Sequence, residues 1–179
     1  MNTKTSTHLK KLTGSALFLA LALALPFLTG QIPSLGNALC PMHLPVLICG
    51  MLFGPLYGGA VGFIAPLLRY LIFGMPPIYP IGLSMAFELM AYGVIAGLMI
   101  KLLPKKIPYI YVSLVTAMVA GRIVWAVVRM FITLFGGAPF GFAIFLADGF
   151  INALPGIILQ IVIIPPIVVA LKKAKLMLN

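Results

Sequence analysis

Long apolar stretches, separated by short segments rich in Pro and Gly, make up most of the chain. A helix that crosses a bilayer needs about 20 mostly apolar residues, and Pro and Gly mark the ends of such helices. Six stretches meet this description, although the second is short. The pattern therefore predicts an all-α integral membrane protein, a single domain over residues 1–179 with six transmembrane helices. The expected spans cover residues 12–29, 44–53, 56–73, 81–103, 109–135 and 142–171.

The nine lysines test this count because they fall in three clusters. Cytoplasmic segments next to membrane helices carry an excess of Lys and Arg. With six spans and both termini in the cytoplasm, all three clusters lie on the cytoplasmic side, and the outer connections contain no Lys or Arg. The clusters are Lys4, Lys10 and Lys11; Lys101, Lys105 and Lys106; and Lys172, Lys173 and Lys175.

The first apolar stretch has an alternative interpretation. Lys10 and Lys11 precede an apolar run in which Ala alternates with Leu over residues 20–24, as at the cleavage site of a secretory signal peptide. Removal of this segment would leave five spans and spoil the charge pattern. We therefore interpret it as the first membrane helix.

Composition supports a membrane protein. The chain is 63% hydrophobic and 8% charged, with a mean hydropathy of +1.20, whereas a soluble domain has about 25% charged residues. This hydrophobicity also excludes a disordered chain. The net charge of +10 is explained by the lysines that orient the chain in the bilayer, so we expect no nucleic-acid partner.

Few side chains are available for catalysis or metal binding. Glu88 and Asp148 are the only acidic side chains, too few for a site that holds two metal ions. No phosphate-binding GxxxxGK[ST] motif occurs, so hydrolysis of ATP by that route is not expected. The two His show no metal-ligand spacing with Cys40 and Cys49, and both Cys are expected to be small apolar fillers. We therefore expect a protein that is not an enzyme and that needs no catalytic residue, metal or cofactor.

All three arginines and both acids lie within apolar stretches. A charge inside the membrane costs at least about 2.5–3.5 kcal/mol, so such residues usually face a cavity or a partner. At a rise of about 1.5 Å per residue, Arg69, Arg129, Glu88 and Asp148 fall roughly 6–11 Å below the outer boundary, and Arg122 lies deeper. These positions predict an outward-facing binding cavity, or structural ion pairs of Arg69 with Glu88 and of Arg129 with Asp148. Three Arg against two acids leave one positive charge unmatched, and this charge would suit an anionic ligand group such as a carboxylate.

Residues one helical turn from these charges, and residues of the Pro-rich outer connections, extend the predicted cavity. The connections over 31–43 and 74–80 contain too much Pro for a helix, and irregular backbone near the membrane is tolerated where it lines a cavity. Met75, Ile78 and Tyr79 are expected to cover the ligand as a lid, unless this segment is an ordinary connector. The candidate substrate-binding residues are Asn37, His43, Arg69, Tyr79, Glu88, Tyr92, Trp125, Arg129, Asp148 and Asn152.

Small residues form two stripes at helical spacing. Ala16, Ala20 and Ala24 recur every four residues, a spacing that lets two membrane helices approach closely. This face packs either inside the bundle or against a partner. A second stripe, which we assign to packing inside the bundle, consists of Gly58, Gly62 and Ala65.

The six spans, the short second helix, the AxxxA first helix and the basic cytoplasmic ends together resemble one family. The chain resembles an S component, the substrate-binding membrane subunit of an energy-coupling-factor (ECF) vitamin transporter. The strongest likeness runs from Leu39 to Gly97 and includes the stretch FGPLYGGAVGF, a turn between short second and third helices. This part of the chain looks most like the pantothenate type.

The resemblance implies the substrate-binding subunit of an ECF-type importer for a vitamin or vitamin precursor, in the plasma membrane of a bacterium. It implies docking on a coupling membrane subunit, the T component, which works with two ATPase subunits, and it places Ala16, Ala20 and Ala24 against the T component. Pantothenate or another small anionic compound is the favoured substrate. The pyridoxine or hydroxymethylpyrimidine, riboflavin and folate types stay open, as does a stand-alone secondary transporter.

Overall fold

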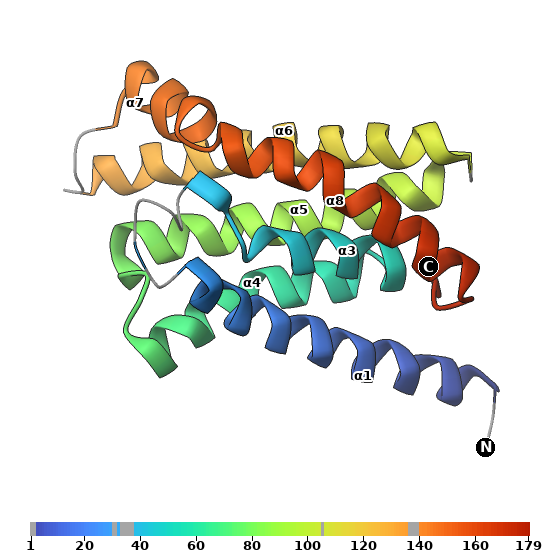
Figure 1. Ribbon diagram of the computed structural model, residues 1–179. Helices are drawn as coiled ribbons and strands as arrows, with labels where there is room; N and C mark the ends of the chain where they lie inside the picture. The colour runs from blue at the N-terminus through green and yellow to red at the C-terminus, as the bar shows by residue number, and fades with distance from the viewer. Residues whose placement is uncertain (1–2, 30–31, 33–37, 105, 136–139) are drawn as a thin grey trace.

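The protein folds into a bundle of helices that run roughly along one axis (Figure 1). The computed structural model describes residues 3–29, 32, 38–104, 106–135 and 140–179, and these residues form helices and no strand. The short elements η1 and η2 adjoin the longer helices α1 and α5, whereas η3 follows the equally short α7. The elements are α1 (Thr3–Ala24), η1 (Leu25–Thr29), α3 (His43–Phe53), α4 (Pro55–Phe73), η2 (Ile78–Gly82), α5 (Leu83–Leu102), α6 (Ile107–Leu134), α7 (Phe142–Leu146), η3 (Ala147–Ile151) and α8 (Leu154–Lys173).

Five helices in the described part of the chain are long and apolar enough to cross a membrane. The all-helical prediction is thereby confirmed, and the count of six spans stays a prediction, because α3 has only 11 residues. A helix of this length rises about 16 Å, roughly half of the hydrocarbon core. The five candidate spans are Thr5–Leu28, Pro55–Phe73, Ile78–Leu102, Ile107–Leu134 and Leu154–Lys173.

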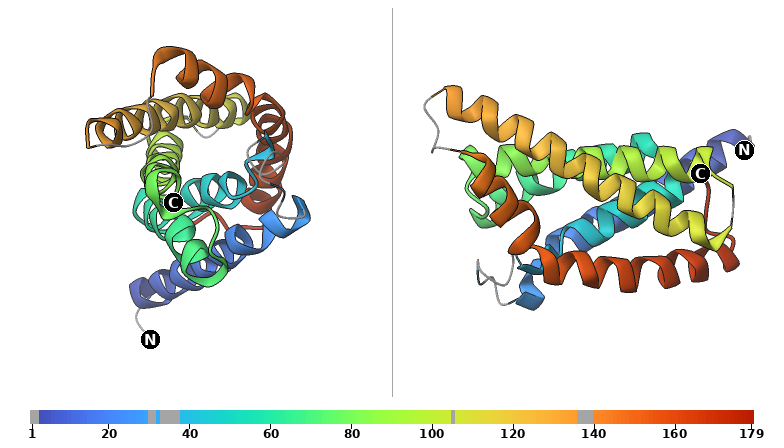
Figure 2. Two further views of the ribbon diagram at one scale, coloured as in Figure 1. Left: turned by 90° about the vertical axis from the view of Figure 1, so that its left-hand side faces the viewer. Right: turned by 90° about the horizontal axis from the view of Figure 1, so that it is seen from above.

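The short helix α3 lies in the middle of the bundle. Every residue of α3 except Leu44 is buried, and the end-on view shows it enclosed by α1, α4, α5 and α8 (Figure 2). Because other helices pack around it, the non-helical residues 40–42 directly before α3 need not face lipid. The N-terminal end of α3 is thus available to line an internal cavity.

The expected single span over residues 142–171 is interrupted. The segment of α7 and η3 ends at Ile151, and α8 begins at Leu154 with Pro155 in its first turn. Pro is tolerated at the start of a helix but cannot donate the hydrogen bond that would continue the preceding turn. No residue of α7 is buried, and α7 with η3 is inclined away from the axis of α8 (Figure 1).

Glycines bring α4 and α5 into close contact. A Cβ atom placed on Gly93 would lie 2.1 Å from the carbonyl oxygen of Gly58, and one on Gly62 would lie 2.2 Å from that of Leu89. Ala65, one turn further along α4, is fully buried. The prediction that Gly58, Gly62 and Ala65 pack inside the bundle is confirmed.

Gly93→Ala is expected to lower the free energy of unfolding by about 1–3 kcal/mol, because the added methyl group must push two helix backbones apart. Thermal unfolding of the purified protein in detergent measures the effect. Gly141→Ala is the matched control, since nothing lies within 4 Å of a Cβ atom at that position. Equal losses of stability in the two variants would contradict the role of close backbone packing.

The segments that carry lysines gather at one end of the bundle. The start of α1, the junction of α5 and α6, and the end of α8 lie there together with both termini (Figure 1). The C-terminal residues fold back against α3 and α5 at this end: the backbone N–H of Leu178 donates to the carbonyl of Leu52, and Asn179 Nδ2 donates to the carbonyl of Gly97, both at 2.8 Å. The cytoplasmic location of this end stays a prediction.

Candidate functional site: a polar cavity in the bundle

A cavity of about 350 Å³ lies at the end of the bundle opposite the lysines. Its walls come from η1, from the start of α3 and the segment before it, from α4, η2, α5 and α6, and from η3 and the turn after it. The linkers before α3 and before η2 supply Pro and Met side chains. The residues that line it are Pro26, Ile32, Cys40, Pro41, Met42, His43, Arg69, Met75, Pro76, Pro77, Ile81, Ser84, Met85, Glu88, Arg122, Trp125, Arg129, Asp148 and Asn152.

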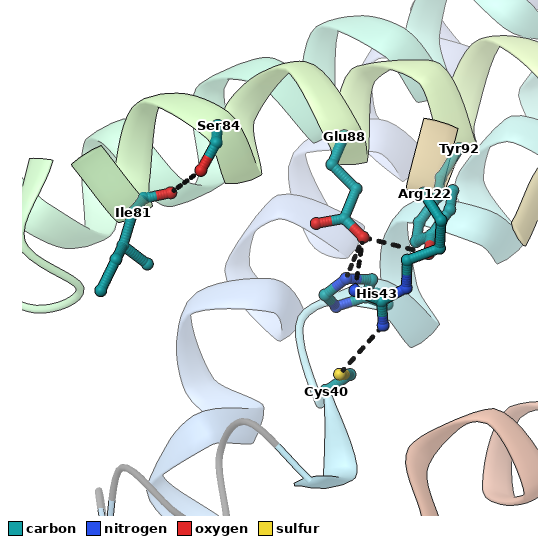
Figure 3. A network of polar contacts seen from close by, with 7 residues as sticks. All are labelled: Cys40, His43, Ile81, Ser84, Glu88, Tyr92 and Arg122. Carbon is teal, nitrogen blue, oxygen red and sulfur yellow. Dashed lines mark hydrogen bonds and ion pairs between the residues drawn. The ribbon is translucent and has the colours of Figure 1, made fainter. Parts of the chain in front are cut away.

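The deepest part of the cavity is a buried ion pair. Arg122 Nη1 lies 2.9 Å from Glu88 Oε1, and the hydroxyl of Tyr92 donates to the same oxygen at 3.1 Å (Figure 3). Arg122 Nη2 also donates to Cys40 Sγ at 3.8 Å. The structural ion pair that we expected between Arg69 and Glu88 is therefore replaced by one between Arg122 and Glu88, and the charge of Arg122 is compensated inside the protein.

His43, the first residue of α3, is in ion-pair contact with the same carboxylate (Figure 3). Its Nε2 is 3.7 Å from Glu88 Oε1, which is too long for a hydrogen bond. Both ring nitrogens are buried and lack a hydrogen bond of good geometry, and Nε2 has only the long contact with Glu88. The side chain is about 3% exposed and lines the cavity. Buried polar atoms rarely lack a partner, so such a group needs an explanation.

Arg69 holds the end of α1 against α4. Its Nη1 donates to the carbonyl of Leu23 at 2.8 Å, and its guanidinium lies 5.3 Å from the ring centres of both Phe27 and Phe73. Leu23 is in the last turn of α1, where the helix carries partial negative charge. Arg69 thus faces the cavity with part of its charge offset by the helix terminus and the two rings.

Arg129 is the least compensated cation in the cavity. Among the described residues no carboxylate lies within ion-pair distance of it, and its buried Nε has no hydrogen-bond partner. The guanidinium rests 5.6 Å from the ring centre of Phe140. The expected ion pair with Asp148 is not formed, because Asp148 is exposed and its Oδ1 accepts a hydrogen bond from Asn152 at 3.0 Å.

Trp125 lines the cavity near Arg129 and is backed by further aromatic rings. Trp125 makes an edge contact with Phe140 at 5.3 Å and stacks on Phe145 at 6.3 Å between ring centres. Phe145 in turn contacts the edge of Phe150 at 5.5 Å. This group of rings was not predictable from residue spacing, since it depends on how the segment of α7 and η3 folds back towards α6.

The structure brings most of the predicted binding residues together. Tyr92 lies behind Glu88 and supports it without lining the cavity. Tyr79 is exposed and donates to the carbonyl of Ile132 at 3.3 Å, and of the three expected lid residues only Met75 lines the cavity. Asn37 lies outside the described residues. The predicted residues that line the cavity are His43, Arg69, Glu88, Trp125, Arg129, Asp148 and Asn152.

Sequence reasoning missed two important residues of the cavity. The count along the span places Arg122 deeper than the other charges, although it lies two helical turns before Arg129 on the same helix and shares the site. Cys40 is more than the apolar filler that its type suggests, because it accepts a hydrogen bond from Arg122. Burial raises the pKa of the Cys40 thiol, so its sulfur stays neutral beside the ion pair.

The alanine stripe of α1 points away from the bundle. Ala16, Ala20 and Ala24 are exposed, whereas Ser15 and Ala22 on the other side of the helix are buried. Packing inside this chain therefore does not explain the stripe. A continuous face of small side chains stays open to lipid or to another membrane helix.

Comparison with protein families places these features in context. A family model described as ECF transporter, substrate-specific component matches residues 10–168. The matched range contains every residue that lines the cavity and the whole alanine stripe. Comparison with curated proteins and with solved structures gave no significant match.

Proposed function

The chain belongs to the family of ECF transporter substrate-specific components, and from this premise we propose that its cavity binds pantothenate or another small anionic vitamin or precursor. Members of this family are transport subunits that bind the substrate, not enzymes. They work with a T component and ATPase subunits, which supply the energy for uptake. We infer that this chain occupies the plasma membrane of a bacterium in the same role.

The charge balance of the cavity is the observation that carries the choice of an anion. Three arginines and two carboxylates line it, and one of the carboxylates is already paired with Arg122. Arg129 has no anionic partner among the described residues. A ligand carboxylate would supply the missing charge through charge-assisted hydrogen bonds, for which the guanidinium fork is well suited.

The proposed orientation places the cavity on the outer side of the membrane. The lysine-bearing segments lie at the opposite end of the bundle, and lysines next to membrane helices are retained on the cytoplasmic side. The termini would then be cytoplasmic, and the ligand would enter from outside. This arrangement suits an importer, because the site faces the compartment from which the vitamin is taken.

A panel of B vitamins tests the function directly. We expect pantothenate to raise the midpoint of thermal unfolding of the purified protein, because a ligand at 100 times its Kd adds about 2.7 kcal/mol to the stability of the folded state. Calorimetric titration gives the affinity. Stabilisation by pyridoxine, riboflavin or folate instead would keep the transport role and change the substrate.

A second measurement separates this role from that of a stand-alone carrier. Vesicles that contain only this chain should show no uptake of the bound vitamin under a proton or sodium gradient. Uptake should appear when the T component and the ATPase subunits are added with ATP. Gradient-driven uptake by the chain alone would overturn the assignment as a subunit and favour a secondary transporter.

A further inference from the structure

The cavity has two chemically different ends, and both are marked by arginines of α6. Arg122 and Arg129 are seven residues apart, which corresponds to two helical turns and about 10 Å along the axis. Arg122 belongs to the buried ion pair with Glu88, whereas Arg129 lies in the part lined by Trp125, with the ring of Phe140 against both. A ligand that contacts both ends must therefore be elongated.

The inner end is suited to a neutral hydrogen-bonding group. Glu88 already neutralises Arg122 at 2.9 Å, so a second carboxylate placed there would be repelled by Glu88. At this end Nδ1 of His43 and Nε of Arg122 are buried without a hydrogen-bond partner, and Nε2 of His43 has only the 3.7 Å contact with Glu88 Oε1. A neutral imidazole has one donor and one acceptor on opposite sides of the ring, and a hydroxyl group can pair with either of them.

The outer end is suited to an anion. Arg129 Nε is buried without a partner, and the adjacent ring of Phe140 contributes only a weak attraction to the guanidinium. Asp148 is held by Asn152 and lies at the exposed rim. The charge of Arg129 is therefore free to attract a carboxylate from the ligand, and the partial burial of the site strengthens that bond.

These two ends define the ligand more narrowly than its charge alone, and this step rests on the proposed function. We propose that the substrate is an elongated monoanion whose carboxylate binds Arg129 and whose opposite, neutral end places a hydroxyl or amide at His43. A molecule with an anion at each end is rejected by Glu88. Pantothenate has a carboxylate at one end of an extended chain and a hydroxyl at the other, and it serves as the probe.

The experiment is a cycle of protein variants against ligand analogues, measured by calorimetric titration. Panthenol replaces the carboxylate of pantothenate by an alcohol, and a deoxy analogue lacks the terminal hydroxyl. The unchanged protein should bind panthenol roughly 10- to 100-fold more weakly than pantothenate. Arg129→Gln should bind the two about equally, and Arg129→Lys should keep part of the preference. Val127 lies on the exposed side of α6. Val127→Ala is the control, and it should keep the full preference for pantothenate over panthenol.

His43→Phe tests the inner end independently. It should keep the preference for pantothenate over panthenol and should lose the preference for pantothenate over the deoxy analogue. The reverse pattern, in which His43→Phe equalises pantothenate and panthenol, would overturn the proposed direction of binding. Thermal unfolding without ligand shows whether each variant is folded. If Arg129→Gln does not fold, the affinities of Arg129→Lys for pantothenate and panthenol test the outer end instead.

Failure of this inference is distinguishable from failure of the proposed function. Tight binding of a vitamin without a carboxylate, such as pyridoxine, would keep the transport role and overturn the two-ended ligand. The two-ended ligand would also be overturned if Arg129→Gln and His43→Phe lowered the affinities for pantothenate, panthenol and the deoxy analogue equally. Absence of binding by any vitamin to the folded, unchanged protein would contradict the proposed function itself.

Discussion

Replacement of Ala20 by Trp is expected to abolish vitamin uptake by the assembled transporter and to leave vitamin binding unchanged. Ala20 is in the middle of the exposed alanine stripe of α1, which we propose as the surface that docks on the T component. Small residues at this spacing allow backbones to approach closely, and an indole group would hold the two helices apart. The cavity lies elsewhere in the bundle, so the ligand contacts remain.

Two measurements on the same preparation check this result. Calorimetric titration should give the same affinity for the vitamin as the unchanged protein, whereas copurification with the T component and ATP-driven uptake in vesicles should be lost. Val119→Trp is the matched control, because Val119 is 46% exposed on α6 and receives the same bulky side chain away from the stripe. Normal uptake by the Ala20 variant, or equal losses in both variants, would contradict the docking assignment.

The positions of most helices were predictable from the apolar stretches. A backbone in lipid must satisfy its own hydrogen bonds, so a long apolar stretch has few alternatives to a helix. The gathering of the lysines at one end followed from the same count. The interruption before Pro155 was harder to predict, since Pro is also found inside α4 at Pro66 and inside α8 at Pro165 without ending those helices.

The partners of the buried charges were not predictable from the sequence. Depth counted along a span assumes that all helices stand upright and start from one plane, whereas tilt and shift are set by packing against neighbours. Arg122 therefore reaches Glu88 although the count placed them at different depths. The presence of charges in apolar stretches predicted a cavity, and only the packing shows which cation is left for a ligand.

Glu88→Gln is expected to lower the free energy of unfolding by about 3–5 kcal/mol, a larger loss than that expected for Gly93→Ala. The substitution leaves the guanidinium of Arg122, which is about 7% exposed, without its carboxylate partner at 2.9 Å. Thermal unfolding of the protein without ligand measures the effect. Tyr92→Phe is the matched control, because it removes one hydrogen bond to the same oxygen and should cost about 1 kcal/mol.

The double variant Glu88→Gln with Arg122→Gln decides between a lost attraction and an isolated charge. If the cost of Glu88→Gln arises mainly from the uncompensated guanidinium, removal of that charge should restore much of the stability, since replacement of both members of a buried pair is often close to neutral. A double variant as unstable as the sum of the two single variants would show that the ion pair does not act as a unit. A loss in Glu88→Gln no larger than that in Tyr92→Phe would mean that the polar cavity compensates Arg122 by other means.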